Sequence, residues 1–182
     1  MLCIDDIPQQ VADDIQGFAL ICFLKTDTMS LIKSNLTERR MHRVFGIKDD
    51  VEYIDREGAY FIPCRKNQVG VVQTPKGYFF LGGGLENGES HLDCIERECI
   101  EEVGYLPCVE GRLCSAEAYI KHPTMGFFHP IQTYYFGTLL DCKFTPTEKD
   151  HILCWKEYDK LKGKMFVEMQ NWALEQLSLY AK

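Results

Sequence analysis

One helix with a clear beginning and a clear end lies near the middle of the sequence, and it constrains the fold more than any other segment. Ser90 is a residue type that caps the N-terminus of a helix, and Gly104 is the type that ends one. Between them, apolar residues recur at spacings of three and four, which places them along one side of a helix. We expect this side to face the core; its residues are Leu92, Ile95, Cys99 and Val103.

Three glutamates near the end of this helix conflict with its electrostatics. Glu98, Glu101 and Glu102 share an arc of about 100°, centred away from the apolar side. Like charges three and four residues apart repel, and a carboxylate in the last turn opposes the helix dipole by about 0.3–1 kcal/mol. Arg97 offsets only part of this cost. A solvated acidic face is the ordinary interpretation, but a divalent cation held by these carboxylates would remove the repulsion, and we favour such a metal site.

A run of three glycines, Gly82, Gly83 and Gly84, stands just before this helix. A bare glycine run is often only a flexible turn. Glycine also lets the main chain approach a ligand closely, so that a backbone carbonyl can join the oxygen shell of a cation. Because the acidic residues follow so soon, we favour the second interpretation.

The stretch from Gly82 to Tyr105 resembles the Nudix box, a motif with fixed glycine, glutamate and arginine positions. The sequence supplies these positions at the required spacing with Gly83, Glu89, Arg97, Glu98, Glu101, Glu102 and Gly104. Cys99 and Tyr105 occupy positions that the motif reserves for apolar residues, and both side chains can be buried. Leu81 replaces the proline that many members have before the glycines.

This resemblance implies a fold, a reaction and a cofactor. The fold is an α+β protein of the Nudix type, an α/β/α sandwich with a mixed β-sheet and a catalytic loop-helix-loop. The reaction is hydrolysis of a phosphoanhydride bond in a nucleotide or nucleoside diphosphate derivative, by attack of water on phosphorus. Mg²⁺ or Mn²⁺ would neutralise the phosphate oxygens and acidify the water. An acidic protein could therefore bind an acidic substrate through metal.

The resemblance also implies roles for individual residues of the box. Glu98, Glu101 and Glu102 are the implied metal ligands, and the carbonyl of Gly82 is a further one. Arg97 orients the glutamates rather than touching the substrate. The general base is Glu98 or Glu102.

Two other glutamates have roles that stay open. Glu89, at the start of the helix, could cap the helix, support the ligands from behind or bind the ion through water, and we favour support. Glu148, in a later loop, could contribute to the general base, as residues from that region do in some family members.

The substrate is less constrained than the reaction. Aromatic residues that could stack on a base are Tyr78, Phe79, Phe127, Phe128, Tyr134 and Tyr135. For each of them a place in the core is the more common role. Arg65 and Lys76 could contact phosphates, whereas His122, His129 and His151 lack metal-ligand spacing. A small nucleoside triphosphate is the leading prediction, and the alternative is a non-catalytic Nudix-fold module that binds a nucleotide or a protein.

Strand patterns flank the central helix. Residues 59–66 and 68–73 are apolar and partly β-branched, which predicts a hairpin. Alternation predicts two more strands at 112–120 and 131–140, with a loop over 121–130 between them. A final helix carries an apolar stripe of Phe166, Met169, Ala173, Leu177 and Tyr180.

The chain is expected to divide into two parts. Residues 43–182 form the Nudix hydrolase domain, because the segment Glu148 to Trp155 and the final helix also resemble the family. Residues 1–42 form an N-terminal helical extension and connector, with an amphipathic helix over about residues 8–24. This extension could make the protein a homodimer.

Charge and cysteine content disfavour several classes of protein. The net charge of −7 argues against a large nucleic acid as partner. The longest apolar run, Phe18 to Leu24, is too short to span a membrane, and no export signal is visible. Nine cysteines form no CxxC pair, which favours reduced thiols in a cytoplasmic protein, with Cys64, Cys94 and Cys99 as small core residues.

Overall fold

The computed structural model describes residues 41–124 and 126–180, apart from the side chains of Cys142 and Tyr180. The predicted helix over residues 8–24 and the connector after it lie outside these residues. Within the described part the elements are β1 (His42–Phe45), β2 (Ile54–Arg65), β3 (Gln68–Thr74), β4 (Gly77–Phe79), β5 (Leu81–Gly84), α2 (His91–Val103), β6 (Tyr105–Ala118), β7 (Ile120–His122), β8 (Gly126–Lys143), β9 (Ile152–Glu157), α3 (Tyr158–Leu161) and α4 (Glu168–Tyr180).

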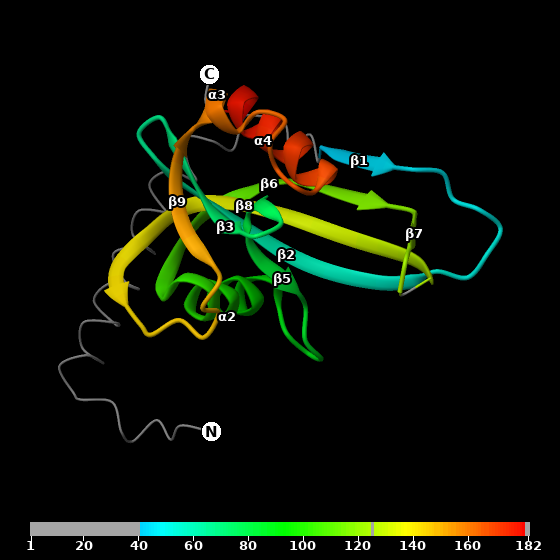
Figure 1. The fold of residues 1–182 in the computed structure, drawn as a ribbon, viewed down its shortest axis with the longest axis horizontal. Helices are drawn as coiled ribbons and strands as arrows, with labels where there is room; N and C mark the ends of the chain where they lie inside the picture. The colour runs from blue at the N-terminus through cyan, green and yellow to red at the C-terminus, as the bar shows by residue number, and fades with distance from the viewer. Residues whose placement is uncertain (1–40, 125, 181–182) are drawn as a thin grey trace. The chain divides into compact units, whose positions relative to one another are not determined.

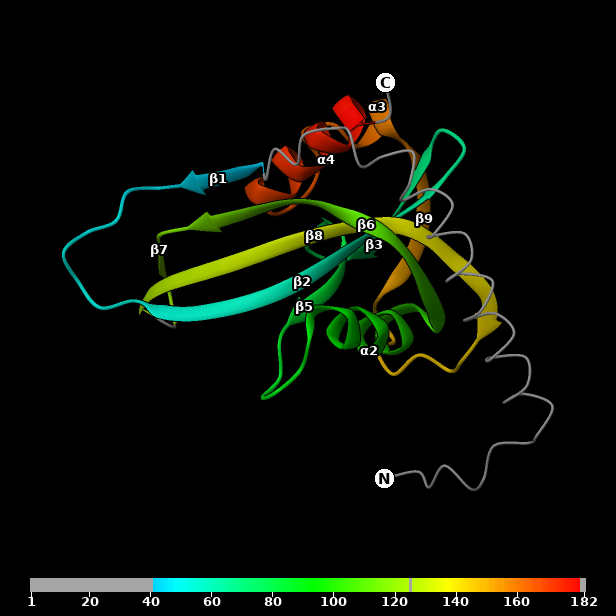
Figure 2. The same ribbon diagram turned by 180° about the vertical axis from the view of Figure 1, so that it is seen from behind.

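A mixed β-sheet forms the middle of the fold (Figures 1 and 2). Its strands follow the order β1-β6-β8-β2-β3-β4, while β5, β7 and β9 pair with β2, β8 and β3. The pairs β1–β6 and β2–β8 are parallel, whereas β6–β8, β2–β5 and β3–β9 are antiparallel. The predicted mixed sheet is therefore confirmed.

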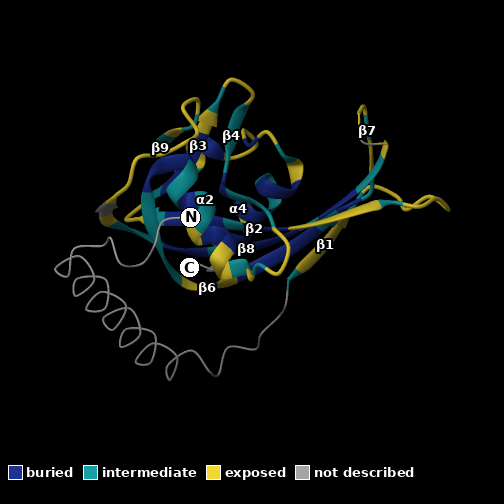
Figure 3. Cartoon of the chain, turned by 90° about the horizontal axis from the view of Figure 1, so that it is seen from below, coloured by how far each residue is buried: buried dark blue, intermediate teal, exposed yellow. Residues whose placement is uncertain are grey.

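Helices cover both faces of this sheet, with α2 on one side and α4 on the other (Figure 1). Two apolar clusters fill the interfaces. The cluster against α4 includes Phe80, Tyr134 and Ala173, and the cluster against α2 includes Phe61 and Ile95. Burial is concentrated where the helices lie over the sheet, and the projecting strand ends are largely exposed (Figure 3). This arrangement is the α/β/α sandwich that the sequence predicted.

The predicted hairpin is present. β2 and β3 pair antiparallel at Cys64–Val69 and Arg65–Gln68, and the turn between them contains Lys66 at φ 51°. A strand pair of this length is stable here because both strands continue into the sheet and bury apolar side chains on it.

The predicted loop over residues 121–130 is wrong. β7 and the first residues of β8 pair antiparallel from Ile120–Phe128 to His122–Gly126, so this segment is a hairpin. Two prolines and a glycine favoured the loop interpretation. However, Pro130 lies within β8 and pairs in register with Arg56 of β2.

The stripe predicted on the final helix is confirmed in part. Met169, Ala173 and Leu177 are buried on α4, and Leu174 joins them. Phe166 does not, because it precedes the first residue of the helix and is 60% exposed. The side chain of Tyr180 is outside the described atoms.

Two other predictions concern the chain's environment. Cys94 and Cys99 are buried as expected, whereas Cys64 is only half-buried. None of the helices in the described ranges combines the length and the apolar character needed to cross a lipid bilayer.

Candidate active site

Helix α2 begins and ends at the predicted residues. Ser90 caps it, because its hydroxyl accepts a hydrogen bond from the Asp93 N–H while the Asp93 carboxylate accepts one from the Ser90 N–H. Gly104 ends it in the left-handed conformation at φ 73°, with its N–H directed to the carbonyls of Cys99 and Ile100. The helix therefore has a fixed register against the sheet.

The apolar side of α2 differs from the prediction at one position. Ile95, Cys99 and Val103 are buried against the sheet, and Cys94 is buried with them. Leu92 is instead 54% exposed. It is the second residue of the helix, in the first turn.

The glycine strand β5 lies beside α2 and brings the main chain against two of the predicted glutamates. A Cβ at Gly83 would collide with Oε1 of Glu98, so this carboxylate occupies space that a side chain would need. Gly82, at φ 124°, donates its N–H to Oε2 of Glu102 at 3.0 Å. The contact observed at Gly82 is thus made by its N–H, and the role of its carbonyl as a metal ligand stays a prediction.

Glu102 is the most buried acid of the site, with 6% of the residue exposed. Burial raises the pKa of its carboxyl to about 8, and the nearby charges of Glu98, Glu148 and Glu101 add to this. The hydrogen bond from Gly82 opposes the rise without cancelling it. Glu102 is therefore a buried acid that turns toward the glycine strand and lines the pocket.

Arg97 holds the other acids together. Its Nε and Nη2 donate to the two carboxylate oxygens of Glu89 at 2.8 and 3.0 Å. Its Nη1 donates to Glu98 at 2.8 Å and to Glu101 at 3.2 Å, and its Nη2 also reaches the carbonyl of Gly84 at 3.4 Å. This guanidinium is thus engaged by protein groups on both edges, which agrees with a role in orienting the glutamates.

The same contacts give the acids different pKa values. The hydrogen bonds from Arg97, together with one from the Glu86 N–H, lower the pKa of Glu89 to about 2. Burial raises the pKa of Glu98, although Arg97 opposes this. Glu89 is thus a firmly ionised partner of Arg97, whereas Glu98 and Glu102 are carboxylates that a cation would stabilise.

The loop between β8 and β9 adds Asp150 and His151, which the sequence did not assign, beside Glu148, which it proposed as a contributor to the general base. The backbone N–H groups of Thr147 and Glu148 both donate to the Glu101 carbonyl, at 2.9 and 3.0 Å, which ties the loop to the end of α2. Glu148, Asp150 and His151 place one potential ligand atom each within 4.8 Å of one another. Their approach to α2 depends on the tertiary fold.

His151 was left without a role by its sequence spacing, yet it lies in the site. Its Nδ1 is 3.2 Å from Oε1 of Glu102, without the geometry of a hydrogen bond, and this buried nitrogen has no other partner among the described residues. The acidic residues just before it in the same loop were the signal that could have identified it.

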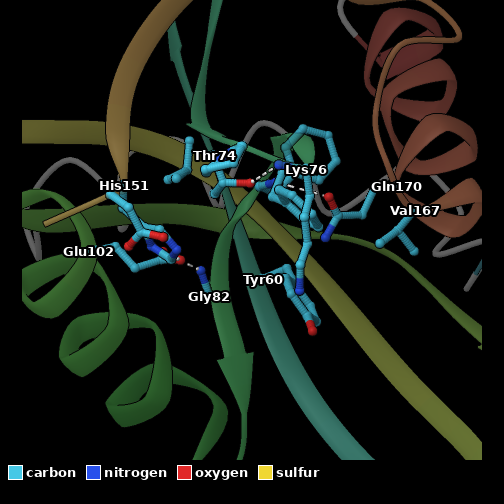
Figure 4. A pocket seen from close by; sticks show the side chains of 13 residues that line it. Tyr60, Thr74, Lys76, Gly82, Glu102, His151, Val167 and Gln170 are labelled. Carbon is cyan, nitrogen blue, oxygen red and sulfur yellow. Dashed lines mark hydrogen bonds and ion pairs between the residues drawn. The ribbon is translucent and has the colours of Figure 1, made fainter. Parts of the chain in front are cut away.

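A pocket of about 410 Å³ opens beside these groups (Figure 4). Glu102 and His151 line one end, while Gln170 and Val167 of the α4 region line the other. Of the predicted aromatic residues Phe79 lines it, and Tyr134 is instead fully buried.

The two basic residues predicted to contact phosphates also lie in different places. Lys76 lines the pocket, but Arg65 lies over the ring of Trp155, 4.2 Å from its centre, elsewhere on the protein. Tyr60 and Gln170 are pocket residues that the sequence reasoning missed. Neither stands in a motif, so only the fold reveals them.

The family model of the NUDIX domain matches residues 54–175 of the chain. The chain belongs to the Nudix family. Its box glutamates, Arg97 and the glycine strand are the elements assembled in the site described above. Leu81, where many members have proline, is fully buried in the apolar cluster against α2, so the replacement contributes to the core.

Solved structures agree with this family at the level of the fold. A MutT Nudix hydrolase from Burkholderia pseudomallei matches with a TM-score of 0.56 and 20% identity, covering 68% of this chain and 98% of that one. A Nudix hydrolase from Nitrosomonas europaea matches with a TM-score of 0.54 and 16% identity, covering 69% and 90%. The E. coli ORF135 protein gives 0.52 and 20%, covering 71% and 92%. The search of curated proteins found no match.

Proposed function

We propose that the protein hydrolyses a phosphoanhydride bond in a nucleotide or nucleoside diphosphate derivative, with Mg²⁺ or Mn²⁺ bound by the box glutamates. One observation carries this proposal. Glu98, Glu101 and Glu148 lie close enough to Glu102 to raise its pKa, and Glu102 lines a pocket and is buried with a pKa of about 8. Such a group of acids is costly unless a cation joins it.

The residues present suit a hard divalent cation. Their potential ligand atoms are carboxylate oxygens, which Mg²⁺ and Mn²⁺ prefer. Arg97 contacts Glu98 and Glu101 but does not contact Glu102 within the described residues. The buried Nδ1 of His151, which lacks a hydrogen bond, marks the same place as polar and incompletely satisfied. Glu98, Glu101 and Glu102 would hold the ion, with the carbonyl of Gly82 beside them.

The bound ion would supply charge neutralisation at the phosphates and a more acidic water. The chain's own residues do the rest. Arg97 fixes Glu98 and Glu101 through charge-assisted hydrogen bonds. Gly82 fixes Glu102 from the strand side. Either Glu98 or Glu102 accepts the proton of the attacking water, and Glu148 is close enough to Glu102 to contribute.

Lys76 is placed to balance the substrate's negative charge. It is a pocket residue and its ammonium can approach a phosphate oxygen. The turn that carries it is held by the Lys76 N–H, which donates to the Thr74 hydroxyl at 3.1 Å. The protein could thus bind an acidic ligand despite its net charge of −7.

A substrate panel with one matched pair of variants tests the proposal. We expect wild type with Mg²⁺ or Mn²⁺ to release phosphate, pyrophosphate or a mononucleotide from at least one compound of a nucleotide panel. Glu102→Gln should lower kcat by roughly 10²–10⁴-fold, because it removes a charge but keeps an acceptor for the Gly82 N–H. Glu96→Gln, on the exposed side of the same helix, should leave kcat unchanged.

Two outcomes would contradict the proposal. Equal rates for wild type and Glu102→Gln would remove the acidic cluster from the chemistry. Tight nucleotide binding by wild type without any turnover would favour the non-catalytic binding module. Titration calorimetry with Mn²⁺ gives an independent readout, since Glu102→Gln should also weaken binding of the ion alone.

A further inference from the structure

The far end of the pocket, away from the acidic cluster, is built mainly of apolar side chains. Phe79, Phe80 and Val167 line it, and the volume of about 410 Å³ is that of the whole cleft, which extends from Glu102 to α4. Apolar walls with a few fixed polar groups are typical of sites for planar organic ligands. The identity of those polar groups therefore decides which ligand fits.

Gln170 is the polar group that the structure fixes most firmly at this end. Only 1% of the residue is exposed, and its Oε1 accepts a hydrogen bond from the Phe80 N–H at 2.9 Å. A backbone N–H can only donate, so the amide oxygen must face Phe80. The amide NH₂ must then face the other way.

That NH₂ group is directed at the cavity. Gln170 lines the pocket, and Figure 4 shows its side-chain amide pointing into it. No hydrogen bond from its Nε2 occurs within the described residues, and this nitrogen is not among the atoms sealed away from solvent. On this side the amide thus offers an N–H donor to a ligand and no acceptor.

Neighbouring contacts keep Gln170 in this position. The Phe166 N–H donates to the Tyr78 carbonyl at 3.0 Å, and the rings of Phe79 and Phe166 pack 5.2 Å apart. The side chain of Asn171 bonds both the N–H and the carbonyl of Met165. These contacts attach the start of α4 to the strand end that carries Phe80, so the amide cannot rotate without losing its bond.

The Thr74 hydroxyl, which also lines the pocket, accepts from the Lys76 N–H and donates to the Gly77 carbonyl, so its proton is already used. A ligand edge that donates toward Gln170 would leave the amide NH₂ unpaired.

We propose that Gln170 is a specificity residue: it selects nucleotides whose base presents a carbonyl, as in 6-oxopurines, over those that present an amino group there, as in 6-aminopurines. This inference rests on the proposed function, because it assumes that the phosphates lie at the Glu102 end. An unpaired donor facing a second donor costs about one hydrogen bond with its desolvation, which corresponds to roughly 10- to 100-fold in affinity.

Inosine and adenosine nucleotides provide the matched pair of ligands. They differ at position 6 and in protonation of the adjacent ring nitrogen, and neither carries the 2-amino group of guanine. Wild-type protein should bind inosine 5′-monophosphate at least about tenfold more tightly than adenosine 5′-monophosphate in titration calorimetry. With Mg²⁺, kcat/KM for inosine triphosphate should exceed that for adenosine triphosphate by a similar factor.

A variant of the same length isolates the amide. Gln170→Met should bring the ratio between the two ligands close to one, mainly by weakening the inosine compound. Gln176→Met is the control, since Gln176 is also buried on α4 but donates to the Trp172 carbonyl at 3.3 Å. It should leave the ratio unchanged. If Gln170 had only a structural role, Gln170→Met would weaken both ligands equally.

The binding and turnover measurements separate the possible failures. Turnover with equal preference for the two bases would overturn the role of Gln170 and leave the proposed hydrolysis standing. Preferential inosine monophosphate binding without turnover of any nucleotide would support the role of Gln170 and overturn the proposed hydrolysis. Neither turnover nor discrimination would overturn both.

Discussion

At the scale of single residues, the space beside Gly83 is occupied by the side chain of Glu98. The carboxylate of Glu98 lies where a Cβ at position 83 would be, so any larger residue there would displace this carboxylate. The sequence predicted that the glycines bring the main chain close to something. It proposed a metal ion as that neighbour, which stays a prediction, and the structure places the carboxylates of Glu98 and Glu102 beside the glycines.

The pairing of Glu89 with Arg97 leads to a prediction about acid stability. Arg97 lowers the pKa of Glu89 to about 2, below the usual value of about 4.3 for glutamate in an unfolded chain. A lowered pKa stabilises the folded state fully above the unfolded value, and the effect is lost as the pH falls toward the folded one. We expect Glu89→Gln to unfold at lower urea concentration than wild type at pH 7, with the difference narrowing at about pH 4 and 3.

Glu96→Gln is the control for this measurement, because it removes a carboxylate from the exposed side of the same helix. Its difference from wild type should change much less between about pH 5 and pH 3. A Glu89→Gln difference that stayed constant over this range would show that the ion pair does not stabilise the fold.

The site residues that the sequence could identify lie in one helix, whereas those that it missed lie in distant segments of the chain. Glu98, Glu101 and Glu102 could be identified because one helix brings them together, and helix geometry can be read from spacing. Asp150, His151 and Gln170 come from segments much further along the chain, and they reach the pocket only through sheet pairing and loop contacts.

At the scale of elements, the end of α2 is held as firmly as its side chains. The carbonyl of Gly104 accepts a hydrogen bond from the Phe144 N–H at 2.8 Å, shortly before the loop N–H groups that bond Glu101. The helix end, the end of β8 and the loop that carries Glu148 and His151 thus form one connected unit. A substitution at this junction should therefore displace the site residues that the loop carries.

Gly104 offers a direct test of that junction. Alanine there would adopt φ 73° and its Cβ would collide with the Phe144 carbonyl. We expect Gly104→Ala to lower the free energy of unfolding by roughly 2–4 kcal/mol, from backbone strain plus displacement of the loop. Urea unfolding measures this loss, and the helix should remain visible by circular dichroism under native conditions.

Gly163→Ala measures the cost of backbone strain at positive φ without a collision of the added Cβ. Gly163 has nearly the same φ, 70°, but no atom lies within 4 Å of the position that an added Cβ would take. Its substitution should cost about 1 kcal/mol. Equal losses at the two glycines would mean that contact with the loop does not hold the end of α2.

Helices and strands were predicted correctly where the sequence has a regular apolar spacing or a helix cap. They were predicted wrongly where proline suggested that a strand was interrupted. The caps of α2 and the β2–β3 hairpin follow from local chemistry. The β7–β8 hairpin was missed because Pro123, Gly126 and Pro130 are common loop residues. The first residues of β8 also pair with β2, a strand far earlier in the chain, and local patterns do not contain that pairing.

At the scale of the whole molecule, the division into residues 1–42 and 43–182 stays a proposal. His42 already belongs to the sheet, since β1 pairs with β6 and the His42 ring bonds the Ser115 hydroxyl at 3.0 Å. Phe45 packs edge-on against Trp172 of α4. A shortened protein should therefore begin at Met41, which keeps β1 complete.

Two shortened chains test this proposal. A chain that begins at Met41 should melt within about 3 °C of the full chain, whereas one that begins at Lys48 and lacks β1 should melt roughly 5–10 °C lower, because it loses sheet pairing and the contact with Trp172. Differential scanning calorimetry measures both. Similar melting of the two shortened chains would mean that β1 adds little stability.

Light scattering on the same proteins examines the possible homodimer. A mass that falls from twice the chain to one chain on removal of residues 1–40 would support a dimer formed through the extension. An unchanged mass would remove the reason to propose one.

Three of the attachments around the acidic groups use main-chain atoms: the Gly82 N–H bonds Glu102, the Gly84 carbonyl bonds Arg97, and the Glu101 carbonyl bonds the loop that carries Glu148. Mutation alters side chains and leaves such atoms in place. One end of the cleft can consequently stay constant over long evolutionary drift while Gln170 and its neighbours are exchanged. New ligand preferences could then arise from a few substitutions beneath α4, without rebuilding the groups that carry out the chemistry.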